Sequence, residues 1–362
     1  MSFDRGSKAT RIKDIADLAG VSIGTVDRIL HSRGRFSANT AERVRRIMDE
    51  LDYRPNLMAQ RLSMSKTCRI GVFMPWPEQD SAYWRLALDG INQASRDLAP
   101  FGLCVELIHY DRYDAAVFMQ AGRSLASRHF DGILMAPLLS DESNAIVAMV
   151  DSLVPIVFFD TDLPGAPRLS FIGQDSRAGG RLAGKLMNLL TAASGPGVEA
   201  LVLMPSAENE HLRQRASGFC EVFQGSTRSV RIAVESDHDL PALHAALEAA
   251  ITPATAAVYV SDASAHFSAE YLSVIASVKQ RKRPSLIGYD LVPENRFCLE
   301  AGDIDFLLTQ RPDEQGYDGV NRLFRKLILD ENPPDHVFTP IDIVTRENVA
   351  YLPVARLEEL AV

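Results

Sequence analysis

Polar side chains that could bind a small hydroxylated molecule follow several apolar runs of this chain. Asp160 ends the run PIVFFD, Asp290 ends SLIGYD, Gln310 ends DFLLTQ, and Asp262 comes two residues after AAVYV. In open parallel sheets, ligands bind beyond the carboxyl ends of the strands. Carboxylates and amides exchange hydrogen bonds with hydroxyl groups, so these positions favour a site for a polyhydroxylated molecule.

Catalysis has little support in the same residues. Asp160 with Asp162, and Asp303 with Asp305, are close enough in sequence for acid–base work, but such isolated pairs carry no further signal. The chain has no GxSxG, P-loop, HExxH or GxGxxG motif, and its eight histidines do not cluster with cysteine or acid at metal-binding spacing. We therefore expect neither an enzyme nor a bound metal or cofactor.

A second chemistry is indicated near the N-terminus, where basic residues gather. Residues 1–67 hold 13 Lys and Arg against 8 Asp and Glu, a net charge of +5, whereas the whole chain carries -9. The remainder therefore carries -14. A basic head on an acidic body is typical of a nucleic-acid-binding arm, although charge also varies along chains without such a reason.

The basic head is predicted to fold as three short helices. Gly20 interrupts the helical pattern, and Ser22 and Ser37 are suitable N-caps for the second and third helices. The residues expected to face inward are Ile12, Ile15, Ala16 and Ala19 in the first helix, Val26, Ile29 and Leu30 in the second, and Val44, Ile47, Met48 and Leu51 in the third. Two helices joined by a short turn, with a third completing the core, form a helix-turn-helix.

The second helix would then lie in the major groove of DNA with its first residues at the base edges. Arg28 is the best candidate for a bidentate contact to guanine, with an ordinary solvated side chain as the alternative. The residues expected to contact DNA from this helix and its ends are Ser22, Ile23, Gly24, Thr25, Asp27, Arg28 and His31.

The head carries a family resemblance over residues 11–67. The ordered motifs IKDIA, AGVS, TVxR and YRPN-x-x-A-x-x-L resemble the headpiece of the LacI/GalR family of bacterial transcription regulators. The resemblance implies a flexible N-terminus at 1–10 and a helix-turn-helix DNA-binding domain at 11–54. The family usually has Ser where this chain has Asp27, and Gly24 lacks a side chain often used to read bases, so the resemblance implies no particular operator sequence.

The segment 55–67 is predicted to be a hinge. Pro55 ends the third helix, and NLMAQRLSMS is helix-competent but too short to be stable alone. In the family this hinge helix folds on the operator. The resemblance assigns DNA contacts to Asn56 and Leu62, with Leu62 wedging between central base pairs. The alternative is a plain linker.

The body, residues 68–362, is predicted to be α/β. Helical stretches at 83–98, 115–128, 177–190 and 312–329 separate most of its apolar runs, which are RIGVFM, LCVELI, DGILMA, PIVFFD, EALVLM, VRIAV, AAVYV, SLIGYD and DFLLTQ. This alternation predicts parallel sheets covered by helices on both faces. About ten strands are too many for one ordinary sheet, so we expect two lobes.

The body resembles the two-lobed, periplasmic-binding-protein-like effector domain of the same family. The motifs that carry the resemblance are RIGVFMP, FDGILMAP, FIGQDSRAGGRLAGKL, HLRQRASGF, VYVSDASA, SLIGYD and LLTQRPDEQGYDGV. The resemblance implies three crossovers between the lobes, near Gly173, Gly302 and Val337. The N-lobe would then hold about 69–172 and 304–336, and the C-lobe about 174–302 and 338–362. A ligand would bind between the lobes and close them.

The resemblance also assigns ligand contacts. In SAYW, Tyr83 or Trp84 would offer an aromatic face to a sugar ring, with packing inside the lobe as the alternative for either. Arg215 matches an arginine that binds ligand oxygens, and Asp290 matches a carboxylate that takes paired hydroxyls. The matched strand-end positions that often line the cleft are Asp160, Asp262 and Gln310; for the acids, helix capping is the alternative.

Together these features predict a cytoplasmic, homodimeric transcription regulator, most simply a repressor. Double-stranded operator DNA and a monosaccharide, cyclitol or sugar acid are the expected partners, coupled reciprocally through closure of the lobes. No apolar run approaches the roughly 18 residues of a membrane span. Scattered cysteines favour a reducing compartment, and ARLEEL is too short for a tetramerising coiled coil.

Two alternatives stay open at this point. A sugar-binding protein of a transport system would share the body fold, but it would need an export signal, and the polar residues 1–10 do not resemble one. An α/β enzyme acting on a sugar is the other alternative.

Overall fold

The computed structural model describes residues 12–30, 36–51, 67–195, 197–204, 209–225, 229–234, 240–278, 280 and 282–352. The chain divides into two compact units, Met1–Ser65 and Lys66–Val362. The first is the headpiece and the second is the body. None of the helices within the described ranges combines the length and the hydrophobicity needed to cross a bilayer.

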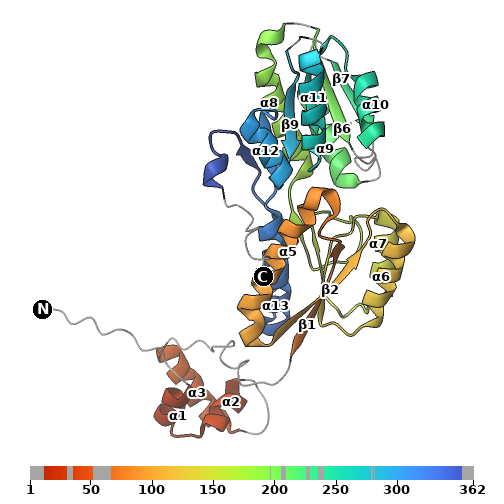
Figure 1. The fold of residues 1–362 in the computed structure, drawn as a ribbon. Helices are drawn as coiled ribbons and strands as arrows, with labels where there is room; N and C mark the ends of the chain where they lie inside the picture. The colour runs from red at the N-terminus through yellow and green to blue at the C-terminus, as the bar shows by residue number, and fades with distance from the viewer. Residues whose placement is uncertain are drawn as a thin grey trace, which may run out of the picture. The chain divides into compact units, whose positions relative to one another are not determined.

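The headpiece consists of α1 (Ile12–Ala19), α2 (Ile23–Leu30) and α3 (Ala38–Glu50), as predicted (Figure 1). Both expected caps are present: the hydroxyl of Ser22 accepts from the Thr25 N–H at 3.2 Å, and the hydroxyl of Ser37 accepts from the Thr40 N–H at 3.2 Å. Gly20 has φ +62°, a left-handed conformation that suits glycine at the turn after α1. Local sequence signals therefore determine this unit.

One residue from each helix anchors the headpiece core. Ile15, Val26 and Val44 are fully buried and pack together with the smaller side chains around them. The prediction that Leu51 faces inward is wrong: it follows the last residue of α3, where the chain leaves the helical spacing, and it is exposed. The side chain of Leu30 lies outside the described residues.

The first sheet of the body forms the N-lobe, with strand order β11-β5-β4-β3-β1-β2. All five pairings are parallel, as predicted. Its strands are β1 (Cys68–Pro75), β2 (Leu103–Tyr110), β3 (Gly132–Met135), β4 (Ile156–Phe159), β5 (Ser170–Gly173) and β11 (His336–Phe338). The helices that accompany it are α5 (Gln79–Leu98), α6 (Ala115–Ser127), α7 (Ser140–Met149) and α13 (Pro312–Leu329).

The second sheet forms the C-lobe, with strand order β12-β10-β9-β8-β6-β7. Among these described strands, the short β12 alone runs antiparallel, against β10. The strands are β6 (Glu199–Met204), β7 (Ser229–Val234), β8 (Thr255–Val260), β9 (Ser285–Tyr289), β10 (Phe306–Thr309) and β12 (Asp342–Val344). The helices are α8 (Ser176–Leu190), α9 (Glu210–Val222), α10 (Leu240–Ala250), α11 (Ala265–Val278) and α12 (Pro293–Ala301).

The chain crosses between the lobes three times, but one predicted crossover is misplaced. The first follows Gly173 as expected, and the third follows β11, close to Val337. The second lies between β10 and α13, not near Gly302. Gly302, with φ +87°, caps α12 and returns the chain to the same sheet, where Phe306 pairs with Ile287. Residues 304–309 therefore belong to the C-lobe, because a glycine turn looks alike in sequence whether or not the chain changes lobe.

Close packing of α5 against α13 builds the N-lobe face that bears the site. A Cβ atom on Gly90 would lie 1.8 Å from the carbonyl oxygen of Asp313, and one on Gly316 would lie 2.4 Å from that of Ala87. Only glycine allows the two helix backbones to approach this closely. The start of α5, which carries Tyr83 and Trp84, is thereby held against the start of α13.

Candidate functional site

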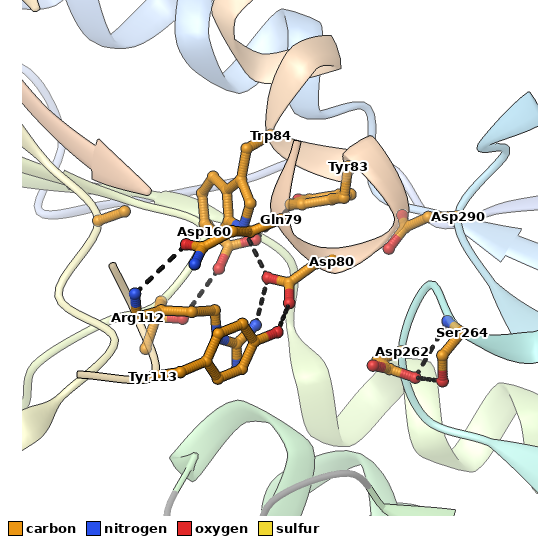
Figure 2. A network of polar contacts seen from close by, with 12 residues as sticks. Gln79, Asp80, Tyr83, Trp84, Arg112, Tyr113, Asp160, Asp262, Ser264 and Asp290 are labelled. Atoms are coloured by element: carbon orange, nitrogen blue, oxygen red, sulfur yellow. Dashed lines mark hydrogen bonds and ion pairs between the residues drawn. The ribbon is translucent and has the colours of Figure 1, made fainter. Parts of the chain in front are cut away.

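The predicted ligand contacts Tyr83, Asp160, Arg215, Asp290 and Gln310 form one group, which we call the strand-end cluster. Hydrogen bonds join Tyr83 to Asp160, and Arg215 to Gln310 and onward to Asp290. All five side chains are buried. Figure 2 shows Asp290, from the C-lobe, pointing toward Tyr83 and Asp160 of the N-lobe. The structure therefore brings these five predicted residues together.

Arg215 lies on α9 and holds the C-lobe half of the cluster. Its terminal nitrogens donate to the carbonyl of Ser261 at 2.8 Å and to the side-chain oxygen of Gln310 at 2.9 Å. The guanidinium lies 3.8 Å from the centroid of the Tyr289 ring, a cation–π contact. Its Nε, however, is buried without a hydrogen-bond partner. Gly180 makes room for this arrangement, since a Cβ there would lie 1.9 Å from the Arg215 carbonyl oxygen.

Asp290 follows β9 in a left-handed conformation, with φ +63°. The amide of Asn295 holds this turn by donating to the carbonyl oxygens of Tyr289 at 2.8 Å and Asp290 at 3.0 Å. Gln310 Nε2 donates to Oδ2 of Asp290 at 3.1 Å, whereas Oδ1 is buried and unpaired. Burial raises the pKa of Asp290 to about 7, even though Arg215 opposes the shift.

Asp160 and Tyr83 form the N-lobe half. Asp160 also has a left-handed backbone, with φ +65°, and its N–H donates to the Gln315 side-chain oxygen at 2.9 Å. The Tyr83 hydroxyl donates to Oδ1 at 2.7 Å and the Thr161 hydroxyl donates to Oδ2 at 2.9 Å. Burial raises the pKa of Asp160, because these bonds and Arg215 only partly offset its loss of hydration.

Trp84 belongs to the core of the N-lobe, which was the alternative to a ligand platform. The side chain is 1% exposed, and its ring makes edge contacts with Tyr83 and Phe159. Its indole N–H donates to Asp80 at 2.6 Å. These contacts favour the packing role, and the interpretation of Trp84 as an aromatic face for a sugar ring stays an untested prediction.

Sequence reasoning missed Asp80, Arg112 and Tyr113, which form a second polar group beside the cluster (Figure 2). The Asp80 carboxylate accepts from Trp84, from the Arg112 guanidinium and from the Tyr113 hydroxyl. Burial alone would raise the pKa of Asp80, but Arg112 and the donated bonds outweigh it and lower that pKa. The available signal was that Arg112 and Tyr113 closely follow β2, at a strand end like the others.

Asp262 lies at the end of β8, where it closes a turn before α11. Its carboxylate accepts from the Ser264 N–H at 3.2 Å and from the Ser264 hydroxyl at 2.6 Å (Figure 2). These bonds form a side-chain turn just before α11 and not the helix cap that was the alternative, so the ligand contact stays a prediction. Asp262 is nevertheless close enough to Asp290 for its negative charge to raise the pKa of that residue.

A direct hydrogen bond joins the two lobes at the edge of the cluster. The hydroxyl of Thr161, in the N-lobe, lies 3.0 Å from Nδ1 of His211, on α9 of the C-lobe. Burial, together with the positive charges of Arg215 and Arg112, lowers the pKa of His211 well below its ordinary value. The imidazole is therefore neutral near pH 7. The same Thr161 hydroxyl donates to Asp160, so the lobe contact and the cluster share one group.

In the headpiece, the first turn of α2 presents an exposed face. Ile23 is 51% exposed, and the exposed Arg28 extends back along the helix, donating to the Gly24 carbonyl at 3.0 Å and to the Thr25 hydroxyl at 3.3 Å. The Ser22 hydroxyl bonds that of Thr25 at 2.9 Å. The remaining predicted DNA contacts, namely the side chain of Asp27 and the residues His31, Asn56 and Leu62, lie outside the described residues.

Comparison with known families matches both units. Residues 70–328 match the model described as periplasmic binding protein domain, and residues 11–56 match that of bacterial regulatory proteins of the lacI family. The first match covers most of the body and the second covers the three headpiece helices.

A curated protein is also similar to this chain. The chain is 28% identical over 182 residues to the HTH-type transcriptional regulator DegA of Bacillus subtilis, a match over 50% of this chain and 52% of DegA. The chain thus spans about half the length of the curated relatives it matches.

Solved structures of similar fold cover the body. A Bacteroides fragilis protein assigned as a LacI transcriptional regulator matches 80% of this chain and 100% of its own, with a TM-score of 0.71 and 23% identity. A solute binding protein of an ABC transporter from Burkholderia graminis, in complex with D-arabinose, matches 79% of this chain and 97% of its own, with a TM-score of 0.69 and 18% identity.

Proposed function

The chain belongs to the periplasmic-binding-protein-domain family and carries a lacI-family regulatory domain at its N-terminal end, and from this we propose that it is a DNA-binding transcription regulator. The headpiece binds an operator, and a small polyhydroxylated effector binds the strand-end cluster. No catalytic step is part of this proposal, since the curated relatives are described as transcriptional regulators.

The headpiece carries the DNA-binding part of the proposal. α2 begins at a capped, solvent-exposed turn, and its core face packs on α1 and α3, which is the arrangement of a recognition helix. Arg28 is the residue best placed to contact a guanine, although two of its nitrogens now bond to its own helix and must exchange those bonds on binding. The net charge of +5 supplies the attraction to phosphates.

The effector part rests on unpaired buried atoms in the C-lobe. Arg215 Nε, Asp290 Oδ1 and Ser261 Oγ are buried without partners, a state that normally costs free energy and that a bound hydroxyl group would relieve. A sugar or cyclitol offers such hydroxyls, and D-arabinose occupies a solute binding protein of the same fold. The proposed site is completed by Tyr83, Asp160, Asp262 and Gln310.

Closure of the two lobes links the sites in this proposal. An effector that contacts both halves of the cluster favours the closed arrangement, and operator and effector affinities then change each other by the same factor. We propose that the protein works in the cytoplasm as a homodimer, most simply as a repressor. Two headpieces would then occupy the two halves of a near-palindromic operator, with the hinge segments and Leu62 at its centre.

A gel-shift titration tests the DNA-binding proposal. The full chain should bind a fragment from upstream of its own gene at low salt, and Arg28→Ala should weaken that binding about 10-fold or more. Arg43→Ala, which changes an exposed arginine on α3, is the matched control. It should have a smaller effect than Arg28→Ala on the preference for the upstream fragment over unrelated DNA. Absence of binding by the full chain, or binding retained without residues 1–67, would contradict the proposal.

A sugar-binding protein of a transport system is the second candidate, because its fold matches the body. It leaves the lacI-family headpiece without a role. The same titration separates the two, since a transport protein has no reason to distinguish its own upstream DNA from an unrelated fragment.

A further inference from the structure

Among the residues that the structure describes at the candidate site, the charged groups are unequal in number. Three carboxylates, those of Asp160, Asp262 and Asp290, lie close enough together for Asp160 and Asp262 each to raise the pKa of Asp290. One guanidinium, Arg215, lies among them. The nearby Asp80 and Arg112 form an ion pair of their own and add no net charge. The site therefore carries an excess of negative charge whenever its carboxyl groups are ionised.

Part of the positive charge present already contacts protein partners. Arg112 is paired with Asp80, and both terminal nitrogens of Arg215 donate to Ser261 and Gln310. One donor, Arg215 Nε, stays unpaired in the core of the cluster. Arg215 therefore keeps unused donors, but its single charge is outnumbered by the surrounding carboxylates, so a ligand carboxylate would add to the excess of negative charge.

Among the carboxylates, in contrast, one oxygen of Asp290 has no hydrogen-bond partner. Asp290 is 2% exposed and its Oδ1 has no partner, although the side chain points toward the N-lobe half of the cluster (Figure 2). A buried carboxylate oxygen without a donor gains most from a ligand that brings a hydrogen, and more if the ligand also brings positive charge. A ligand carboxylate at the same place would face Asp290 and Asp160 across a short distance in a poorly hydrated site.

We propose that the site selects its effector by charge: it binds an amine-bearing sugar more tightly than the neutral sugar of the same ring, and it excludes the corresponding sugar acid. The proposal rests on the effector function proposed above, and it removes sugar acids from the expected effector class. Asp290 is the residue that determines this selectivity, with Asp160 and Asp262 adding to the negative field.

Protonation adds an independent signature. Because burial raises the pKa of Asp290 to about 7, this carboxyl holds a proton at mildly acidic pH, where an exposed aspartate is ionised. An ammonium group beside Oδ1 favours the ionised form and displaces that proton. Binding of the amine should therefore release protons near pH 6, where the sugar amine is itself still protonated, and should tighten as the pH rises from 5 to 6.5.

Matched sets of sugars test the proposal on the full chain. Isothermal titration compares glucosamine, glucose and glucuronate, then the galactose and mannose sets, each in two buffers of different ionisation enthalpy. In whichever set binds, the amine should bind about 10-fold more tightly than the neutral sugar, and the acid at least about 10-fold more weakly. In Asp290→Asn the amine should lose its advantage, and its proton release should disappear.

The outcomes separate this inference from the function it rests on. An acid that binds as tightly as its neutral partner, or an amine with no advantage, overturns the charge selectivity and leaves a sugar-binding regulator intact. Binding by no member of any set overturns the sugar effector and the inference with it.

The thermal transition of Asp290→Asn is recorded alongside the titrations to establish that the variant folds. A folded variant with unchanged selectivity overturns the assignment of Asp290. If the variant does not fold, the order of the three affinities in the parent chain still decides whether the site selects by charge.

Discussion

The two lobes differ in how completely the buried hydrogen bonds around the candidate site are made. On the N-lobe side, the carboxylates of Asp80 and Asp160 each accept bonds from neighbouring side chains of the same lobe. On the C-lobe side, buried atoms of Arg215, Asp290 and Ser261 have no partner. On the N-lobe side, folding alone completes the hydrogen bonds of these carboxylates. On the C-lobe side, a bound ligand would supply the hydrogen bonds that are still missing. Substitutions on the N-lobe side should cost stability, and those on the C-lobe side should cost binding.

The largest effect is expected from Asp80→Ala. This change leaves Arg112 without its buried partner and the Trp84 and Tyr113 donors without their acceptor, so the free energy of unfolding should fall by about 3–5 kcal/mol. Urea denaturation measures it. Glu78→Ala is the control, because Glu78 pairs with Arg85 at the exposed surface and should change stability by less than about 0.5 kcal/mol. Similar losses of stability in both variants would show that the buried hydrogen bonds of Asp80 do not stabilise the fold more than an exposed ion pair does.

The next effect concerns binding. Asp290→Ala should weaken effector binding about 100-fold, because the ligand loses an acceptor that is buried and has no hydrogen-bond partner in the protein. Operator affinity without effector should be unchanged. Titration calorimetry measures the loss, with Asp303→Ala, an acid bonded to Ser273 elsewhere in the C-lobe, as the control. An unchanged titration in Asp290→Ala would take Asp290 out of the site.

The pH dependence of stability sharpens the same contrast. The pKa of Asp290 rises from the ordinary 3.8 to about 7 on folding, so the folded state holds this proton more tightly than the unfolded state. Stability is therefore lost as the pH rises from about 4 to 7. Asp290→Asn removes that loss and should exceed the parent by about 2–4 kcal/mol at pH 8, with no difference near pH 4.

Asp330→Asn is the control for this pH series. Lys326 lowers the pKa of the exposed Asp330, the opposite direction, so its substitution should give no gain at high pH. A gain of the same size in both variants would mean that net charge, and not burial at the cluster, controls the pH dependence.

The smallest effect is expected where the halves touch. Thr161→Val removes the hydroxyl that contacts His211 across the lobes and should cost the closed arrangement about 1 kcal/mol, seen as an effector affinity about 5-fold weaker. Ser273→Ala, which removes a hydrogen bond within the C-lobe, should leave effector affinity unchanged. Equal affinities in Thr161→Val and the parent would show that this contact does not contribute to closure.

The local parts of the fold were predictable from sequence. The caps at Ser22 and Ser37 and the buried faces of the headpiece helices follow from spacing within a few residues. The nine apolar runs became strands for the same reason. β5, β11 and β12 were not among them, since their stretches SFIG, HVF and DIV each hold only two consecutive large apolar residues.

The long-range parts were less predictable. Strand ends identified Asp290 and Gln310 as neighbours, because adjacent parallel strands of one sheet align their carboxyl ends. Asp160 follows a strand of the other sheet, and only the two-lobed resemblance predicted that it would meet them. The pairing of Asp80 with Arg112 joins residues that lie 32 apart in sequence. It also involves three successive residues in the left-handed conformation, 80–82, which no sequence pattern predicted. The same turn aims the Trp84 indole at Asp80, which is why an aromatic predicted to face the ligand packs inside the lobe.

The central claim is that this protein couples a DNA-binding headpiece to an effector site. Thermodynamic linkage tests it most directly. The affinity of the full chain for its upstream DNA is measured by fluorescence anisotropy with and without saturating effector, and effector affinity is measured with and without saturating DNA. Both affinities should change by the same factor, about 5-fold or more. A factor of one in both titrations would show that DNA and effector bind independently and would contradict the account.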